Sequence, residues 1–485
     1  MKTLKLLSLT LFILFVSCDK GKENSLSTEL DVIENGLLPG IKIKDKTEKF
    51  NLLDRMKHHK VPGVSIAIID EGKVKFAKGY GIANTNTNSK VDVNTLFQAG
   101  SISKPIAALA ALKLAQEGVV DLDEDVNTYL KGWKIPDNTF TGTEKVTLRR
   151  LLTHTANMTV HGFPGYKQKD TFPTDVQVLN GKGNTPKIFV DGVPGSIWRY
   201  SGGGYTVMEK VVEDMSGQTL DAYLAEHILA PMGMDNSTYQ QPIDATKYTN
   251  ISAAYDTQGK IIEGLWNNYP EQAAAGLWTT PKDLAKYCIE IQEILKGKSG
   301  VLSKETVEKM LTKDKNNWGL GPSLRWEKDS LIFSHGGKNA GFTNQMMAFA
   351  NRGQGVIIMT NADNGGRLMA EVLRAVSSHY NWNVIGQREI EIIDIPLETL
   401  EGLVGKYKLN YQVPNIGDYI VDVTIEDGKL TVTDPNNGEV NTLTPIGADK
   451  FLDLQSGNEL VTNSKDGKQG ILFDGRFQLY KMDKK

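Results

Sequence analysis

Two groups of strand-like segments flank a long helical stretch, and this order restricts the possible folds more than any other feature of the sequence. Val64–Ile69 is rich in β-branched residues, and turn residues lead from it into a second run at 73–77, which predicts a hairpin. Strand-like segments return only at 331–334, 345–350 and 355–360. The simplest packing returns the late strands to the early sheet and leaves the helical stretch as a second lobe.

Apolar residues at spacings of three and four predict helices between the two groups of strands. Ser101–Glu117 shows this spacing, and Gly118 ends it. We therefore expect an α/β fold, namely an α+β sheet domain over 46–385 with an all-helical insert at about 98–315. Further helical patterns are predicted at 205–215, 220–228, 281–295, 304–311 and 366–380.

The sequence changes character after Pro396. Apolar and more polar residues alternate along 419–426, and turn dipeptides such as Asp474-Gly475 separate short strand-like segments. A chain of 485 residues has room for about two to four domains. We expect residues 397–485 to form a small all-β domain, either a sandwich or a barrel.

The N-terminal residues resemble a bacterial lipoprotein signal. Two lysines precede the apolar run Leu6–Val16, which is shorter than the roughly 20 residues needed to span a bilayer, and Cys18 follows it after one small residue. We expect a signal peptide at 1–17, a lipidated Cys18 and a polar tether at 18–45. The protein would then be a membrane-anchored lipoprotein of the bacterial cell envelope, either periplasmic or on the surface. The alternative is an ordinary secretory signal followed by an incidental cysteine.

Charge, cysteine count and missing motifs exclude several classes of protein. The chain has 55 basic and 58 acidic residues, which leaves no electrostatic reason to expect a nucleic-acid partner. Cys18 and Cys288 are too few for a disulfide scaffold or a Cys₄ zinc site, and the HExxH, Walker A and full GxGxxG motifs are missing. We expect no metal and no cofactor, and a small molecule or peptide as substrate. The oligomeric state stays open.

Ser101 and Lys104 form an SxxK motif at the start of the predicted apolar helix. A spacing of three places the hydroxyl and the amine on one helix face. A serine needs a base to attack a carbonyl carbon, and a desolvated lysine with a lowered pKa can be that base. The helix N-terminus would stabilise a developing oxyanion. The alternative interpretation is a helix N-cap beside a surface lysine.

Tyr200 precedes a loop with three consecutive glycines, Gly202 to Gly204, and then a helical pattern. The glycines allow a close backbone approach and would present Tyr200 at a cleft. A phenol beside a lysine loses its proton more easily and can act as a base. The alternative is a tight turn whose tyrosine belongs to the core.

A second glycine-rich stretch, His335-Gly336-Gly337-Lys338, lies between two strand-like segments. Its glycines would let a substrate lie along a strand edge, and a backbone N–H beyond them can complete an oxyanion hole. The alternative is a hairpin with an exposed histidine.

In this order, the three motifs resemble those of the serine β-lactamase and penicillin-binding-protein superfamily, on its class C side. That family carries an SxxK motif, then Tyr-x-Asn, then Lys-Thr-Gly or a His-x-Gly variant. The stretches 151–155, 231–234 and 276–280 also resemble the family, and the resemblance covers roughly 45–385. It implies the family's sheet domain with its helical insert, and the final domain resembles a β-domain that is appended to some relatives.

The resemblance implies a role for each matching residue. Ser101 would be the acylated nucleophile, and Lys104 and Tyr200 would jointly provide general base catalysis. His335 stands where relatives carry Lys or His. The backbone N–H groups of Ser101 and Lys338 would form the oxyanion hole, and Gly336 and Gly337 would line the substrate.

Two departures from the family pattern bear on the substrate. Gly202 occupies the position of the asparagine side chain that contacts the substrate amide in β-lactamases. His335 replaces a permanent cation, and a histidine with an ordinary pKa is mostly neutral at neutral pH. Both changes favour the esterases and D-amino-acid peptidases of the superfamily over an antibiotic-destroying β-lactamase.

We therefore expect a serine hydrolase that acts through an acyl-enzyme on ester or amide substrates in the bacterial envelope. An esterase and a D-stereospecific peptidase or carboxypeptidase remain equal candidates. Three alternatives stay open: a true β-lactamase, a penicillin- or D-peptide-binding envelope protein that is acylated without turnover, and a purely structural envelope protein.

Overall fold

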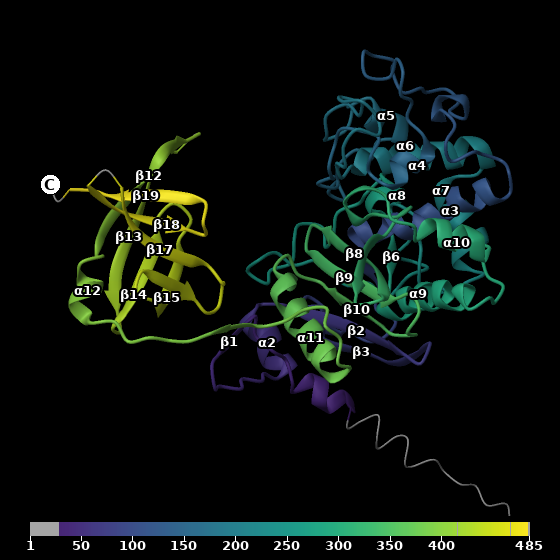
Figure 1. The fold of residues 1–485 in the computed structure, drawn as a ribbon. Coiled ribbons are helices and arrows are strands. Elements are labelled where there is room, and N and C mark those ends of the chain that lie inside the picture. Colours follow the sequence, from purple (N-terminus) through teal and green to yellow (C-terminus); the bar gives the residue numbers. More distant parts are fainter. Residues whose placement is uncertain (1–28, 415, 466, 484–485) are drawn as a thin grey trace, which may run out of the picture.

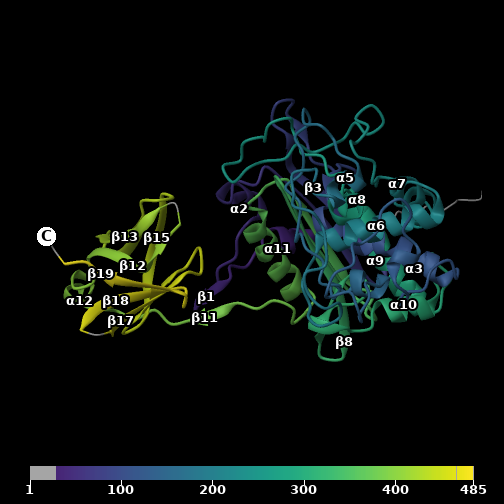
Figure 2. The same ribbon diagram turned by 90° about the horizontal axis from the view of Figure 1, so that it is seen from above.

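A computed structural model describes residues 29–414, 416–465 and 467–483. It contains a domain of sheet and helices and a smaller β-barrel, joined by a connecting segment (Figures 1 and 2). The expected signal peptide and Cys18 lie outside the described residues. Among the described residues, no helix combines the length and the apolar character that crossing a membrane requires.

Seven antiparallel strands form one sheet in the order β4-β3-β2-β10-β9-β8-β7. The predicted return of the late strands is confirmed, because β10 pairs with β2 and places Ile358 opposite Ile66. The chain leaves this sheet at one edge, through β4, and re-enters it at the other edge, through β7. The strands are β2 (Gly63–Asp70), β3 (Lys73–Asn84), β4 (Ser89–Lys90), β7 (Ser323–Glu327), β8 (Ser330–Asn339), β9 (Phe342–Phe349) and β10 (Gly355–Thr360).

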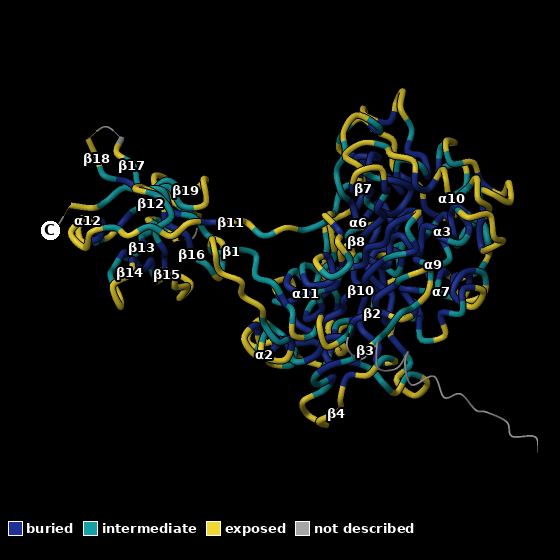
Figure 3. Tube along the Cα trace, turned by 60° about the horizontal axis from the view of Figure 1, so that its bottom comes forward, coloured by how far each residue is buried: buried dark blue, intermediate teal, exposed yellow. Residues whose placement is uncertain are grey.

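Side chains of the central strands alternate between two apolar layers. In β2, Ile66 and Ile68 belong to the layer under α2 and α11, whereas Ala67 and Ile69 belong to the layer that holds α9 and the helical lobe. Because both faces are covered, β2 is buried from Gly63 to Ile69 and apolar except for Ser65, rather than alternating. Figure 3 shows the middle of the sheet as buried. The three helices are α2 (Leu52–His58), α9 (Pro281–Leu295) and α11 (Gly365–His379).

The helical lobe is built around α3 (Ser103–Gln116), whose residues from Ser103 to Leu112 are all buried. α6 (Gly202–Ser216) packs against α3 and begins three residues before the predicted pattern. It begins there because the Ser201 side chain accepts a hydrogen bond from the Gly204 N–H and caps the helix. The other helices of the lobe are α4 (Leu148–Leu152), α5 (Asp175–Leu179), α7 (Leu220–Leu224), α8 (Gln272–Ala275) and α10 (Lys304–Met310), and a short two-stranded sheet joins β5 (Phe97–Gln98) to β6 (Trp278–Thr279).

Residues 29–45 pack on the sheet domain, although their sequence predicts a polar tether. Ile33 and Leu37 are 3% and 0% exposed and belong to the apolar layer under α11. β1 (Ile41–Ile43) then pairs in parallel with β11 (Arg388–Ile390). The tether interpretation is therefore wrong for 29–45. Two apolar residues four positions apart anchor the segment, but they are too few to form a visible pattern in the sequence.

The C-terminal domain is a closed barrel of eight antiparallel strands. The sequence leaves a sandwich or a barrel open, and the pairing of β12 with β19 decides for the barrel because it closes the ring. α12 (Leu397–Glu401) precedes the first strand. The strands are β12 (Gly405–Val413), β13 (Gly417–Glu426), β14 (Lys429–Asp434), β15 (Glu439–Gly447), β16 (Lys450–Asp453), β17 (Glu459–Lys465), β18 (Lys468–Phe473) and β19 (Phe477–Lys481).

Candidate active site

Ser101 and Lys104 are held together by the buried start of α3. Ser101 lies in a 3₁₀ turn, Gly100–Ile102, that runs directly into this helix. The Nζ of Lys104 lies 3.1 Å from the Ser101 Oγ. Lys104 is 2% exposed, and the residue that caps α3 is Ile102, which makes no side-chain cap hydrogen bond. The alternative of an N-cap serine beside a surface lysine is therefore wrong.

Burial changes the chemistry of the Lys104 amine. Desolvation lowers its pKa to about 7. The Nζ also donates to the carbonyl oxygen of Ala274 at 2.7 Å and lies 5.0 Å from the ring centre of Tyr200. Near pH 7, about half of these amines are neutral and have a lone pair available to the Ser101 hydroxyl.

Tyr200 reaches the same place from the entry of α6. The Ser101 side chain lies close enough to act on its phenol as a hydrogen-bond partner, which favours the ionised form. Burial nevertheless raises the pKa of Tyr200, and the hydrogen bond opposes this only in part. The sequence predicts a phenol that loses its proton more easily. The structure shows the reverse, because the cost of desolvating a phenolate outweighs the stabilisation that its neighbours supply.

His154 fixes the backbone next to Tyr200. The N–H of Ser201 donates to the Nδ1 of His154 at 3.1 Å, and the rings of His154 and Tyr200 lie 4.2 Å apart. Burial and the nearby Lys104 charge lower the pKa of His154 well below its usual value. The neutral ring therefore carries its proton on Nε2, which is buried and has no hydrogen-bond partner among the described residues.

His335 lies 6.1 Å from the Tyr200 ring and is 4% exposed. Burial, with a smaller contribution from the Lys104 charge, lowers its pKa to about 3, so the ring is neutral near pH 7. Its Nδ1 lies 2.6 Å from the carbonyl oxygen of Gly336. A carbonyl only accepts, so Nδ1 carries the proton and Nε2 is a buried acceptor. The alternative of an exposed histidine is wrong, and the ring has no N–H left to donate to a substrate.

The glycine-rich stretch forms the second half of β8 rather than a loop. β7 pairs with β8 only as far as Ser334, so from His335 onward this side of β8 faces the turn that holds Ser101. A Cβ on Gly337 would lie 1.9 Å from the carbonyl oxygen of Ala99, and one on Gly100 would lie 2.5 Å from the backbone nitrogen of Lys338. The two glycines therefore let the backbone of Lys338 lie directly beside the Ser101 turn.

The side chains around this strand differ from what the family pattern requires. The Lys338 Nζ turns to the Asp363 carboxylate at 2.5 Å. Gly202 has no room for a side chain, because its Cβ would lie 2.9 Å from the Phe163 ring and 3.1 Å from the His161 carbonyl oxygen. Restoring an asparagine at position 202 would require a shift of Phe163.

Comparison with known proteins decides the family. Residues 51–380 match the protein family described as Beta-lactamase.

The chain belongs to the beta-lactamase family.

Curated relatives of this beta-lactamase-family chain include two proteins of Staphylococcus aureus. The first is protein flp of strain MW2, which is 24% identical over 382 residues, or 75% of this chain and 69% of that protein. The second is a teichoic acid D-alanine hydrolase, which is 24% identical over 277 residues, or 57% of this chain and 63% of that enzyme.

Solved structures of similar fold extend the comparison to the barrel. The octameric penicillin-binding protein homologue from Pyrococcus abyssi has a TM-score of 0.62 and 23% identity, and the match covers 89% of this chain and 98% of that one. The D-amino acid amidase from Ochrobactrum anthropi SV3 has a TM-score of 0.56 and 19% identity, over 73% of this chain and 99% of that one. Both show the fold, and the expected fold class is confirmed.

The structure brings Ser101, Lys104, Tyr200 and His335 of this beta-lactamase-family domain to one place and adds residues that the sequence did not single out. Trp318 lies 5.1 Å from the His154 ring and 5.5 Å from the His335 ring. Trp198 lies 5.4 Å from Trp318. The position of Trp198 two residues before Tyr200 is a sequence signal that it lies near the site. No local pattern marks Trp318.

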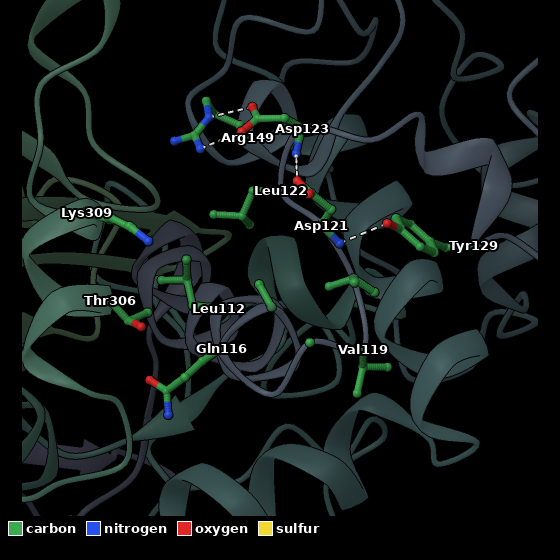
Figure 4. A pocket seen from close by; sticks show the side chains of 13 residues that line it. Leu112, Gln116, Val119, Asp121, Leu122, Asp123, Tyr129, Arg149, Thr306 and Lys309 are labelled. Atoms are coloured by element: carbon green, nitrogen blue, oxygen red, sulfur yellow. Dashed lines mark hydrogen bonds and ion pairs between the residues drawn. The ribbon is translucent and has the colours of Figure 1, made fainter.

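A groove at the other end of α3 has a volume of about 490 Å³ and is lined by Leu112, Gln116, Val119 and Asp121 (Figure 4). None of the predicted site residues lines it. The Arg149 guanidinium at its rim is already paired with a carboxylate (Asp123, at 2.7 and 2.8 Å). Thr306 and Lys309 also line the groove, but the Thr306 hydroxyl is hydrogen-bonded to Ser303 and the exposed Lys309 amine is paired with Glu305, so neither forms a buried nucleophile and base like Ser101 and Lys104.

Proposed function

We propose that this protein is a serine hydrolase that forms an acyl-enzyme with esters or amides of D-amino acids. The observation that carries the proposal is the 3.1 Å contact between the Ser101 hydroxyl and a buried lysine whose pKa is about 7. A hydroxyl beside a neutral amine in a desolvated site is an activated nucleophile.

The neutral Lys104 amine has the geometry of a general base. One of its N–H groups donates to Ala274, so its lone pair can accept the Ser101 proton while the Ser101 Oγ bonds to the carbonyl carbon of the substrate. The bond from that carbon to the leaving oxygen or nitrogen then breaks, and the leaving group takes the proton. Attack by water on the acyl-enzyme releases the acid and returns the proton to Ser101.

Tyr200 is better suited to hold a proton than to remove one. Its raised pKa keeps the phenol protonated near neutral pH, and its hydroxyl already contacts Ser101. We assign Lys104 as the base and Tyr200 as the proton relay: the phenol protonates the leaving group and regains a proton from the Lys104 ammonium. This assignment replaces the joint one that the family resemblance implies.

The absence of a cation at position 335 favours substrates without a carboxylate beside the reacting bond. His335 is neutral, and its single N–H is held by Gly336. A β-lactam carboxylate would lose a charge-assisted hydrogen bond there, worth about 1.5–3 kcal/mol or very roughly one to two decades in rate. Similarity to a teichoic acid D-alanine hydrolase and to a D-amino acid amidase supports this substrate class.

The test compares three substrates on the purified full chain: the p-nitrophenyl ester of D-alanine, the same ester of L-alanine, and nitrocefin. We expect kcat/KM for the D-ester to exceed that for nitrocefin at least tenfold. Turnover of nitrocefin at an equal rate would restore a β-lactamase, and a preference for the L-ester would remove the D-amino acid from the proposal.

Intact mass after treatment with a fluorophosphonate tests the nucleophile. We expect one covalent adduct on the wild-type chain and none on the Ser101→Ala variant, with unchanged circular dichroism. Ser303→Ala, on α10 and outside the site, is the matched control and should label fully. A labelled Ser101→Ala variant would overturn the assignment, and a stable acyl adduct without turnover of the ester would indicate an acyl-binding protein instead.

A further inference from the structure

The C-terminal barrel contains an apolar cavity of about 580 Å³ that is distinct from the proposed active site. This volume lies within the range of small-molecule binding pockets. Eight-stranded barrels are wide enough to hold one small ligand.

The barrel is shaped as a cup, closed at one end and open at the other. At the closed end, Leu400 and Leu403 of the α12 segment belong to the barrel core, and the Leu403 carbonyl accepts from the Tyr407 hydroxyl. The cavity is lined from the opposite end, where β12 ends, β13 begins and β18 turns into β19. Figure 1 shows α12 at one end of the barrel and the tip of the β12–β13 hairpin at the other.

Apolar side chains continue from the cavity to the solvent at this open end. Val421, Val432 and Leu479 line the cavity and are nearly fully buried. Tyr411 and Phe477 also line it, and they are 52% and 42% exposed. An exposed apolar patch that continues a buried cavity marks either a ligand-binding groove or a protein interface.

The charged side chains that line the cavity are all acidic, and the other polar side chains are neutral asparagines and tyrosines. Asp434, Glu439 and Asp474 contribute carboxylates, and no Lys, Arg or His is found among the described residues that line the cavity. Asp434 accepts a hydrogen bond from the Tyr419 hydroxyl, and Asp474 accepts one from the Glu459 N–H. Glu439 is the first residue of β15, is exposed and lies at the open end. A ligand that enters meets negative charge before it reaches the apolar interior.

We propose that the barrel binds one amphiphile with a single apolar tail and a cationic headgroup. The tail would occupy the space between Val421, Val432 and Leu479, and the headgroup would remain near Glu439 and Asp434 at the open end. Burial of the apolar tail supplies the affinity, and the acidic rim selects the sign of the headgroup.

The experiment uses N-phenyl-1-naphthylamine, a neutral dye that fluoresces in apolar sites, with the full chain. We expect saturable fluorescence with equal affinity in the wild type and in Ser101→Ala. Dodecylamine should displace the dye at a concentration at least tenfold lower than dodecanoate. No fluorescence gain, or equal displacement by both amphiphiles, would overturn the proposal.

Two charge reversals test the rim without touching the core. Glu439→Lys should reduce the preference for dodecylamine at least fivefold, whereas Glu426→Lys, an exposed reversal at the other end of β13, should leave it unchanged. An equal effect of both variants would mean that the preference reflects net charge, and the rim would not be the site.

Val432→Trp would fill the cavity, and the dye should then no longer bind; dye binding retained by a folded variant would place the dye elsewhere. If that variant does not fold, Glu439→Lys and its control Glu426→Lys still test whether the amphiphile binds at the rim. If the wild type binds no dye while Tyr411→Ser changes its oligomeric state, the exposed aromatics belong to a protein interface, and the ligand proposal is wrong.

Discussion

At the scale of single residues, Lys104 sets the pH range in which Ser101 can be activated. Only the neutral amine has a lone pair for the serine proton, and the pKa of Lys104 is about 7. The neutral fraction rises about tenfold between pH 6 and pH 8, so we expect kcat/KM for a neutral p-nitrophenyl ester to rise by about the same factor.

The control for this pH profile lies on the same helix. Lys104→Met should abolish turnover, whereas Lys113→Met, which removes an exposed ion pair with Glu117, should leave both the rate and the profile unchanged. A wild-type profile that is flat between pH 6 and pH 8 would contradict the assignment of Lys104 as the base.

His154 is a positioning residue. Its replacement should lower both the stability and kcat while leaving substrate binding nearly unchanged. His154→Phe removes the acceptor for the buried Ser201 N–H, which should lower the free energy of unfolding by about 1–3 kcal/mol. Because Tyr200 loses its support, kcat should fall more than tenfold while KM for the ester changes little.

Urea titration and steady-state kinetics measure the two effects of His154→Phe. His161→Phe is the matched control, since the His161 ring also contacts Tyr200, at 4.9 Å, but is exposed. A similar loss of kcat in both variants would mean that ring contact alone, and not the hydrogen bond to Ser201, positions Tyr200.

At the scale of elements, the start of α6 links helix capping to the site. Ser201→Ala removes the side-chain oxygen that accepts from the Gly204 N–H and should cost about 1 kcal/mol of stability. Ser303→Ala removes the equivalent cap of α10 and should cost a similar amount. Only the first variant should lower kcat, because only α6 carries Tyr200 into the site. Equal kcat in both variants would contradict this link.

The sequence predicts elements well where one pattern runs through the whole element. The predicted boundaries of α9 are those of the structure, since Thr280 caps a proline-initiated helix with a clear apolar face. The predicted strand at 331–334 is too short, because β8 runs on to Asn339. Glycines normally disfavour strands. Gly337 is needed here because a Cβ would lie 1.9 Å from the Ala99 carbonyl oxygen, whereas a Cβ on Gly336 would meet nothing closer than 3.7 Å.

The sequence predicts which residues meet at the site, but not which of their atoms carry protons. The SxxK spacing leads directly to the contact between Ser101 and Lys104, and the motif order leads to Tyr200 and His335. The direction of the Tyr200 pKa shift and the His335 tautomer depend on burial and on one carbonyl, that of Gly336. Neither leaves a mark in the sequence, since both arise from how distant segments enclose the residues.

At the scale of the whole molecule, the barrel and the sheet domain have separate cores. The apolar cluster of the barrel begins at Leu400, and the two clusters of the sheet domain end at Trp382. The connecting segment contacts the barrel through the ion pair of Arg388 with Glu459 and through Ile395, which packs against the barrel core. A chain that stops at Pro396 keeps β11 and should remain folded, with unchanged kcat/KM for a small ester.

Circular dichroism and a single thermal transition of this shortened chain measure its folding. Stopping the chain at Arg388, which removes most of β11, is the comparison and should lower the transition temperature because β1 loses its partner. Aggregation of the chain that stops at Pro396 would mean that the barrel covers apolar surface of the sheet domain.

The pairing of β2 with β10 has a consequence for biosynthesis. Ile66 lies opposite Ile358, so β2, an interior strand of the sheet, stays without its second partner, β10, which is translated about 290 residues later. At 5–20 residues per second, this interval is roughly 15–60 s. During that time the nascent β2–β3 hairpin leaves one edge of a largely apolar strand unpaired, the kind of surface that aggregates. The edge is covered only once the segment that contains β10 leaves the ribosome.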